Sequence, residues 1–371
     1  MEEKSNKQNI TTSIKTFTIP NPSNIYLDQG IIFKAFKKEN QALFSYLKAL
    51  LSDSKNFRAY WLATQFLRES DIYTLDKNNL KDLLNILIES RNISLRDLYP
   101  SFDYLFKDKV IYAIEINSSN LLNNNFILNI INERLITKGL ESFVLRGTHW
   151  EIILTKLRKE LCLLNEDKSK KIDKYKSLIN ALALQMFLNE YVYYCEQKET
   201  DLIQEILNSS SPIEENDISI LACYIPLYKI INKHPSLQFY QSSDKHFNQL
   251  LKVQITEPLE EIRLSRSIKK IGSINNPISQ KVKSQYESNP YPRWFSGNLY
   301  KGRKSTLIQS INAEIAPNSL SLIKDSKPIN ILIAGCGTGM QIIQAQRYDN
   351  AQITAIDISS ASLSFAQRKI N

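Results

Sequence analysis

The sequence predicts a mainly helical region followed by the first βαβ unit of an α/β fold, a class written α + α/β. Apolar residues recur at three- and four-residue spacing over most of residues 25–270, which is typical of amphipathic helices. The last segment, 329–371, instead contains two short β-branched runs separated by a glycine-rich turn and a helical stretch. Between these parts lies a basic, proline-containing segment at 271–328.

The composition is that of a globular protein with room for two or three domains. Of 371 residues, 43% are apolar and 23% are charged. The polar start, "MEEKSNKQNITTSIK", is unlike a secretory signal, and no later run approaches the ~20 apolar residues of a membrane span. We therefore expect a cytoplasmic protein that does not enter a membrane. Its four cysteines are far apart and lack metal-ligand spacing, so we expect reduced thiols and no metal.

The helical part is expected to be irregular, because no repeat with a period of about 34 residues is visible. Residues 1–24 are rich in Asn, Ser, Lys and Thr and are expected to form a flexible arm before the helical domain at 25–270. Asp76 is expected to cap a helix that stops before Pro100. The longest helix is expected over residues 173–210.

Two further local predictions concern this helical domain. The stretch "LLKVQITEPLEEIRL" is expected to form two helices joined at "TEP", with Thr256 as a cap and Pro258 early in the second helix. His149 is followed by Trp150 and Glu151, but no partner signature accompanies it. We expect a structural histidine in preference to a catalytic one.

The positive charge of the chain is concentrated near the end of the helical domain. The chain has a net charge of +9, and the segment from Arg263 to Lys304 holds ten basic residues and one acid, Glu287. We interpret this segment at 263–304 as the solvated face of helices beside a linker, in preference to a binding site for an anionic ligand such as nucleic acid. Within it, "NPYPRW" is expected to be an extended, anchored segment.

Three of the nine glycines in the chain lie between positions 335 and 339, directly after the run "INILIA". A glycine turn between a strand and a helix permits positive φ, lets a ligand approach the backbone, and offers free N–H groups to an anion. Asp357 comes 22 residues after Gly335, at the carboxyl end of the second run, where its carboxylate can accept hydrogen bonds from ribose hydroxyls. The spacing GxGxG favours S-adenosylmethionine (SAM) over the GxGxxG pattern of NAD.

These motifs resemble a known family. "ILIAGCGTGMQ" resembles motif I of the class I SAM-dependent methyltransferases, and "ITAIDISSASLSFAQRK" resembles their second strand and following helix. "ISQKVKSQYESNPYPRW", "ALALQMFLNEYVYY" and "QITEPLEEIRL" are similar to a bacterial methyltransferase group often fused to tetratricopeptide repeats. The resemblance extends from about residue 146 to the end, and implies the Rossmann-like fold of that class with SAM as cofactor.

The resemblance also implies roles for particular residues. Asp357 would bind the ribose of SAM, Ile358 would pack beside its adenine, and Tyr286 would lie over the cofactor as a lid. Cys336 would be a small filler of the loop and no nucleophile. The loop itself would hold the methionine part of SAM through Gly335, Cys336, Gly337, Thr338 and Gly339.

Residues 329–371 supply two strands of a fold that has seven in this family, so the sequence is interpreted as a fragment. We expect poor protection of these residues and weak or absent SAM binding by the chain alone. The methyl acceptor and the catalytic residues are not indicated, although a protein or other large acceptor fits a fused helical domain. The alternatives are a helical protein-interaction module with a vestigial cofactor site and an NAD(P)-binding oxidoreductase.

Overall fold

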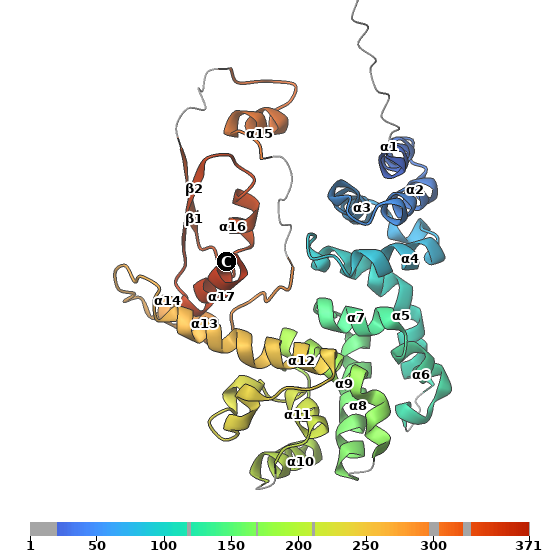
Figure 1. Cartoon of the computed structure of the whole chain (residues 1–371), viewed down its shortest axis with the longest axis vertical. Helices are drawn as coiled ribbons and strands as arrows, with labels where there is room; N and C mark the ends of the chain where they lie inside the picture. The colour runs from blue at the N-terminus through green and yellow to red at the C-terminus, as the bar shows by residue number, and fades with distance from the viewer. Residues whose placement is uncertain are drawn as a thin grey trace, which may run out of the picture.

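The computed structural model describes residues 21–116, 120–167, 170–209, 212–296, 304–321 and 328–370. They form a curved helical region, blue to yellow in Figure 1, and a small α/β unit, drawn in red, beside it. The expected order, a mainly helical part followed by two parallel strands, is confirmed. None of the described helices combines the length and the apolar character that a membrane span requires.

The helical region begins inside the segment expected to be an arm. Residues 1–20 lie outside the described part of the chain, and residues 22–24 already belong to the first helix, which Asn21 caps. The α-helices of this region are α1 (Pro22–Ala35), α2 (Glu39–Ser52), α3 (Phe57–Glu69), α4 (Lys77–Leu87), α5 (Tyr99–Glu115), α6 (Asn125–Ile131), α7 (Arg134–Ser142), α8 (Thr148–Glu166), α9 (Lys176–Leu188), α10 (Gln197–Asn208), α11 (Glu215–Ala222), α12 (Lys245–Leu251) and α13 (Glu257–Ser265).

Helix α9 lies at the centre of the helical core. Every residue from Leu178 to Leu188 is buried, and the helix packs against α7, α8, α11 and α12. The expected cap of α4 is confirmed, since the Asp76 carboxylate accepts a hydrogen bond from the Asn79 backbone N–H at 2.9 Å. That helix ends earlier than expected, at Leu87, and Pro100 lies in the first turn of α5.

The prediction of one long helix at 173–210 was wrong, because the chain turns after α9. Glu190 and Tyr191 have φ of 59° and 58°, in the left-handed region. The Tyr191 backbone N–H donates to the Met186 carbonyl at 2.9 Å, which closes the C-terminus of α9 before α10 begins at Gln197.

Around "TEP", Pro258 lies in the first turn of a second helix, α13, as expected, but the predicted cap at Thr256 was wrong. Thr256 has helical φ and ψ of −62° and −49°, and its side chain caps nothing. Instead, α12 continues into α13 through a π-helical turn, Lys252–Thr256, which accommodates Pro258 without breaking the helix. The result is the long helical segment on which the α/β unit rests in Figure 1.

The remaining elements form the C-terminal part of the chain. Strands β1 and β2 are parallel, with Ile329 opposite Ala351. The prediction of buried strands was wrong, since no residue of either strand is fully buried and Leu332 and Ile356 are 65% and 44% exposed, although α16 packs against the strands. The elements are α14 (Pro277–Ser288), α15 (Leu307–Glu314), β1 (Ile329–Ala334), α16 (Met340–Ala345), β2 (Ala351–Ile356) and α17 (Ser360–Ile370).

Candidate functional site

The glycine-rich turn joins β1 to α16 and is fastened to the neighbouring strand. Gly335 and Gly337 have φ of 69° and 50°, a region that other residues rarely adopt. The backbone N–H groups of Gly335 and Cys336 both donate to the Ile356 carbonyl, at 2.9 and 3.1 Å. The turn therefore lies across the carboxyl end of β2, the edge at which parallel sheets bind ligands.

The three glycines of the turn have different surroundings. A Cβ atom added to Gly335 or Gly337 would meet nothing within 4 Å, so the backbone there is open to an incoming group. A Cβ atom added to Gly339 would lie 2.6 Å from the Cβ of Ala366 in α17. Gly335 and Gly337 thus leave space beside the turn, whereas Gly339 permits close packing of the turn on α17.

The carboxylate of Asp357 lies next to the same turn. Its Oδ2 accepts a hydrogen bond from the Gly337 N–H at 2.8 Å, and its Oδ1 accepts one from the Ser359 N–H at 2.9 Å. These bonds hold the half-buried carboxylate in one orientation, and each oxygen retains acceptor capacity. Ile358 follows, with 41% of its surface exposed.

The "NPYPRW" segment fastens the turn to the helical region. The Trp294 indole N–H donates to the Thr338 carbonyl at 3.0 Å, and the Thr338 hydroxyl donates to the Pro292 carbonyl at 2.9 Å. Two residues further on, the Ser296 hydroxyl donates to the carbonyl of Ile93 at 2.8 Å. The expected anchored, irregular segment is therefore confirmed, and its anchors reach both parts of the molecule.

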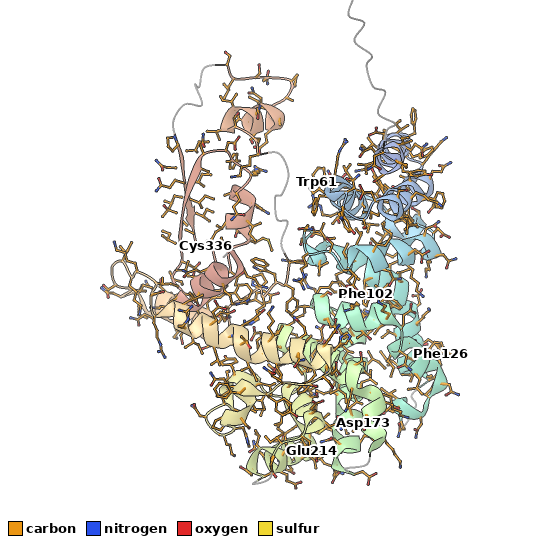
Figure 2. The ribbon with its side chains drawn as sticks, viewed as in Figure 1. Trp61, Phe102, Phe126, Asp173, Glu214 and Cys336 are labelled. Carbon is orange, nitrogen blue, oxygen red and sulfur yellow. The ribbon has the colours of Figure 1, made fainter. Side chains whose placement is uncertain are left out.

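A cavity of about 690 Å³ lies between the turn and the helical region. One wall comes from Gly335–Thr338 and another from Tyr291–Ser296. The opposite wall comes from the helical region, through the end of α3, the short helix Leu95–Leu98 and the loop after α7. Figure 2 labels Cys336 in the α/β unit and Phe102 in the helical region across from it. The volume is within the range of small-molecule sites, about 300–1,000 Å³.

Several ionisable groups line this cavity. Burial raises the pKa of the Asp97 carboxyl above its ordinary value, and the positive charges of Arg68 and Arg96 counter that rise. Burial raises the pKa of Tyr99 to about 12. Burial, followed by the negative charge of Asp357, raises the pKa of Cys336 to about 11, so this thiol is protonated at neutral pH and is a poor nucleophile.

The residues proposed from the sequence fall into two groups in the structure. The loop from Gly335 to Thr338 lines the cavity, and Asp357 joins it through its bond to Gly337. Tyr286 does not line the cavity and lies on α14, 37% exposed. Its neighbour Glu287 binds the N-terminus of α17, accepting hydrogen bonds from the backbone N–H groups of Ser360 and Ala361 at 2.9 and 3.1 Å. The roles of Tyr286 and Ile358 stay predictions.

Sequence reasoning did not identify the wall that the helical region contributes. Arg68, Arg96 and Arg146 come from three segments that only the tertiary fold brings together, and no local motif surrounds them. "NPYPRW" was the one available signal, because its aromatic residues between prolines indicated an anchor. Tyr291 and Trp294 of that segment line the cavity.

Only some basic residues of the segment at 263–304 are available to a ligand. The guanidinium group of Arg293 is bound by Glu190 at 3.1 Å and by Glu261 at 3.6 Å. Residues 297–303, including two of its basic residues, lie outside the described part of the chain. The exposed residues at 266–270 include Arg266, Lys269 and Lys270. An anionic ligand for this segment stays a prediction.

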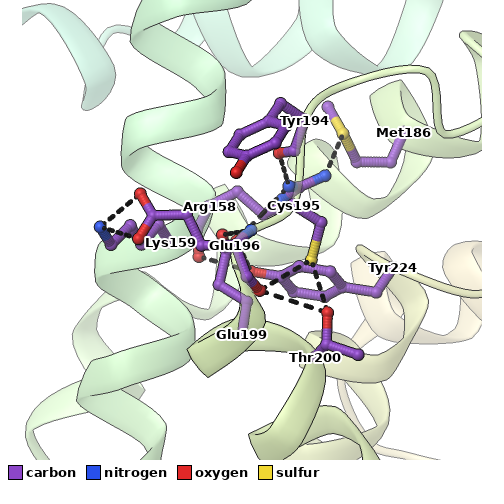
Figure 3. Close-up of polar contacts among 9 residues, drawn as sticks. All are labelled: Arg158, Lys159, Met186, Tyr194, Cys195, Glu196, Glu199, Thr200 and Tyr224. Carbon is purple, nitrogen blue, oxygen red and sulfur yellow. Dashed lines mark hydrogen bonds and ion pairs between the residues drawn. The ribbon is translucent and has the colours of Figure 1, made fainter.

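Two other clusters have structural explanations. His149 lies on α8, and its Nε2 is 2.9 Å from the Asp103 carboxylate, which also accepts a hydrogen bond from the Trp150 indole at 2.7 Å. Arg158 and Glu199 form an ion pair in the helical core (Figure 3), with 2% and 1% of their side chains exposed. Both clusters join helices, and neither residue pair lines the cavity.

Comparison with family models, with curated proteins and with solved structures finds no match to this chain. Within the described residues, no group of three or more His, Cys, Asp or Glu side chains is placed to hold a metal ion.

Proposed function

We propose that this chain carries the glycine-turn part of a SAM site in a Rossmann-like fold, and that the protein is a SAM-dependent methyltransferase. The observation that supports this most is the open space beside Gly335 and Gly337, next to an oriented Asp357 carboxylate and facing a cavity. A ligand that contacts bare backbone and also offers ribose hydroxyls fits this arrangement.

The residues present fit the cofactor. The backbone at Gly335 and Gly337 can approach its methionine part, and the free acceptor sites of Asp357 can bind its hydroxyls. When bound, the sulfonium of SAM provides an electrophilic methyl group. The chain's own contribution is to position the reactants and to exclude water, for which Tyr291 and Trp294 supply an aromatic wall.

Asp97 is the acid that lines this cavity, and its raised pKa favours a role in accepting a proton. We propose it as the general base if the acceptor loses a proton on methylation. Replacing Asp97 by Asn would then lower the rate of methyl transfer without weakening the binding of SAM.

A matched pair of glycine substitutions tests the cofactor site. Gly335 and Gly272 have nearly equal φ, 69° and 71°, and neither has an atom within 4 Å of an added Cβ. Alanine therefore imposes similar backbone strain at both positions, but only Gly335 lines the cavity. Saturation-transfer NMR of SAM is suited to the weak binding expected of one βαβ unit.

We expect saturation transfer to SAM from the unmodified chain and from Gly272→Ala, and a loss of the signal in Gly335→Ala. NADH should give no signal under the same conditions. Transfer to NADH in place of SAM would favour the oxidoreductase alternative. A SAM signal that survives Gly335→Ala unchanged would place the ligand elsewhere and contradict the proposal.

A further inference from the structure

The wall of the cavity opposite the glycine turn is positively charged. Arg68, at the end of α3, Arg96, in the short helix Leu95–Leu98, and Arg146, in the loop after α7, all line it. All three are exposed residues, so their guanidinium groups remain hydrated and accessible. Asp97 is the acidic residue among the lining residues.

Arg68, Arg96 and Arg146 form no ion pair among the described residues, although Arg68 and Arg96 lie near enough to Asp97 for their charges to lower its pKa. Across the described ranges, no carboxylate lies within 4.0 Å of a charged nitrogen of Arg68, Arg96 or Arg146. Arg293 also lines the cavity but differs, because Glu190 and Glu261 both bind it. Three guanidinium groups and the single carboxylate of Asp97 leave this wall with a net positive charge.

Guanidinium groups bind carboxylates and phosphates through paired N–H donors, and several of them together select an anion over a neutral group. The turn wall differs, since it offers open backbone at Gly335 and Gly337, next to the Asp357 carboxylate, which binds the Gly337 N–H but does not itself line the cavity. The cavity therefore has one wall suited to a ligand with hydroxyl donors and an opposite wall suited to an anion.

We infer that the helical region provides the acceptor site, and that Arg68, Arg96 and Arg146 bind an anionic group, a carboxylate or a phosphate, of the acceptor. The assignment of this anion to a methyl acceptor rests on the proposed function. The anion site itself is independent of the cofactor and can be measured without it. It also gives the helical region a role in the cavity beyond supporting the α/β unit.

Two probes distinguish the possible anionic groups: glutarate, followed by saturation-transfer NMR, and inorganic phosphate, followed by broadening of its phosphorus resonance. The test variant replaces Arg68, Arg96 and Arg146 with alanine in the full chain. The control replaces Arg58, Arg91 and Lys107 with alanine. The control residues are also exposed and lie outside the cavity lining, so both variants lose the same charge.

We expect at least one probe to bind the unmodified chain, and the test variant to weaken that binding about tenfold or more, the effect of losing one strong charge-assisted contact. The control should change it less than about twofold, since distant exposed charges are screened by salt. The probe that responds identifies the group. Circular dichroism should show both variants folded.

Three results would overturn the inference. Neither probe binds the unmodified chain, both variants weaken probe binding equally, or the test variant loses the saturation-transfer signal of SAM as well as anion binding. The last would assign the arginines to the cofactor's own carboxylate. Because the probes are measured without SAM, anion binding with no SAM binding would contradict only the proposed function. SAM binding without anion binding would contradict only this inference.

Discussion

Glu261 of α13 and Arg368 of α17 form an ion pair between the helical region and the α/β unit. The Arg368 Nη2 lies 2.7 Å from Oε1 of Glu261, and the Arg368 Nε donates to the same oxygen at 2.9 Å. The other oxygen of Glu261 lies 3.6 Å from Arg293, and the side chains of all three residues are at most 10% exposed. One buried carboxylate thus joins α13, α17 and the segment that contacts the glycine turn.

Replacing Glu261 with Gln should loosen the α/β unit from α13. The change removes a charged acceptor that Arg293 and Arg368 share, although Arg293 keeps Glu190 and Arg368 keeps Glu257, so we expect a cost of about 1.5–3 kcal/mol, that of a hydrogen bond to a charged group. Hydrogen exchange of residues 360–370 should therefore accelerate. Glu260→Gln, at an exposed position one residue earlier, is the control. Equal exchange in the two variants would contradict a role for the ion pair in docking.

Lys369 predicts an unusual dependence of stability on pH. Burial lowers the pKa of its ammonium group to about 8, although the nearby Glu257 carboxylate opposes that effect. Below pH 8 the lysine is charged in both the folded and the unfolded state, and the folded state bears the desolvation cost. As the pH rises from 8 toward the ordinary pKa of 10.5, the folded state releases a proton that the unfolded state retains, so stability increases.

The full increase that Lys369 contributes to the free energy of unfolding is about 3 kcal/mol, from the size of its pKa change. Guanidinium unfolding at pH 7 and at about pH 9.5 should therefore show a rise relative to Lys369→Met, which keeps only the opposing fall from buried thiols such as Cys336. Lys252→Met, at an exposed site, serves as the comparison and should retain the rise. A rise of the same size in Lys369→Met would assign it to other groups.

The parts of the fold that local chemistry determines could be predicted from the sequence. The cap at Asp76 depends on a side chain and a backbone N–H three residues apart, and the glycine turn depends on residues that are contiguous in the chain. Both could be read from short stretches. The same holds for the anchoring of "NPYPRW", whose composition excludes regular structure.

The remaining features depend on contacts between distant segments. Arg68 and Gly335 line one cavity although 267 positions separate them, and no periodicity encodes that proximity. The end of α9 also escaped prediction, because Tyr191 takes a left-handed φ that its residue type does not favour. At Thr256, the π-helical turn continues a helix past residues that ordinarily begin one.

The glycines of the turn should respond differently to substitution. Gly335→Ala adds only backbone strain, about 1 kcal/mol or somewhat more, because its Cβ meets open space. Gly339→Ala, with a φ of 90°, also forces a Cβ to 2.6 Å from Ala366, and such overpacking adds about 1–3 kcal/mol.

Hydrogen exchange of α17 in the two variants should therefore accelerate more for Gly339→Ala than for Gly335→Ala. SAM binding provides the complementary measurement, since only Gly335 faces the cavity. Equal destabilisation by both substitutions would mean that α17 moves to accommodate the added methyl group.

The buried pair Arg158–Glu199 should stabilise the helical region without contributing to the cavity. Glu199 lies 3.4 Å from the Arg158 Nη2, accepts a hydrogen bond from the Tyr224 hydroxyl at 2.6 Å, and accepts one from the Glu196 backbone N–H at 2.9 Å (Figure 3). Its carboxylate therefore joins α8, the start of α10 and the second residue after α11. Burial raises the pKa of Tyr224 well above its ordinary value, so the hydroxyl remains a donor at neutral pH.

Replacing Glu199 with Gln removes the charge that balances Arg158, although the Gln amide oxygen can still accept the hydrogen bond from the N-terminus of α10. We expect a loss of about 3 kcal/mol in the free energy of unfolding, as for other buried pairs that lose one partner. Glu205→Gln, exposed on the same helix, should cost less than about 0.5 kcal/mol. Replacing Arg158 with Met and Glu199 with Leu together should restore part of the loss, because no unpaired charge then remains buried. A double variant less stable than Glu199→Gln would mean that the hydrogen bonds to Tyr224 and Glu196, and not the charge balance, dominate the contribution of Glu199.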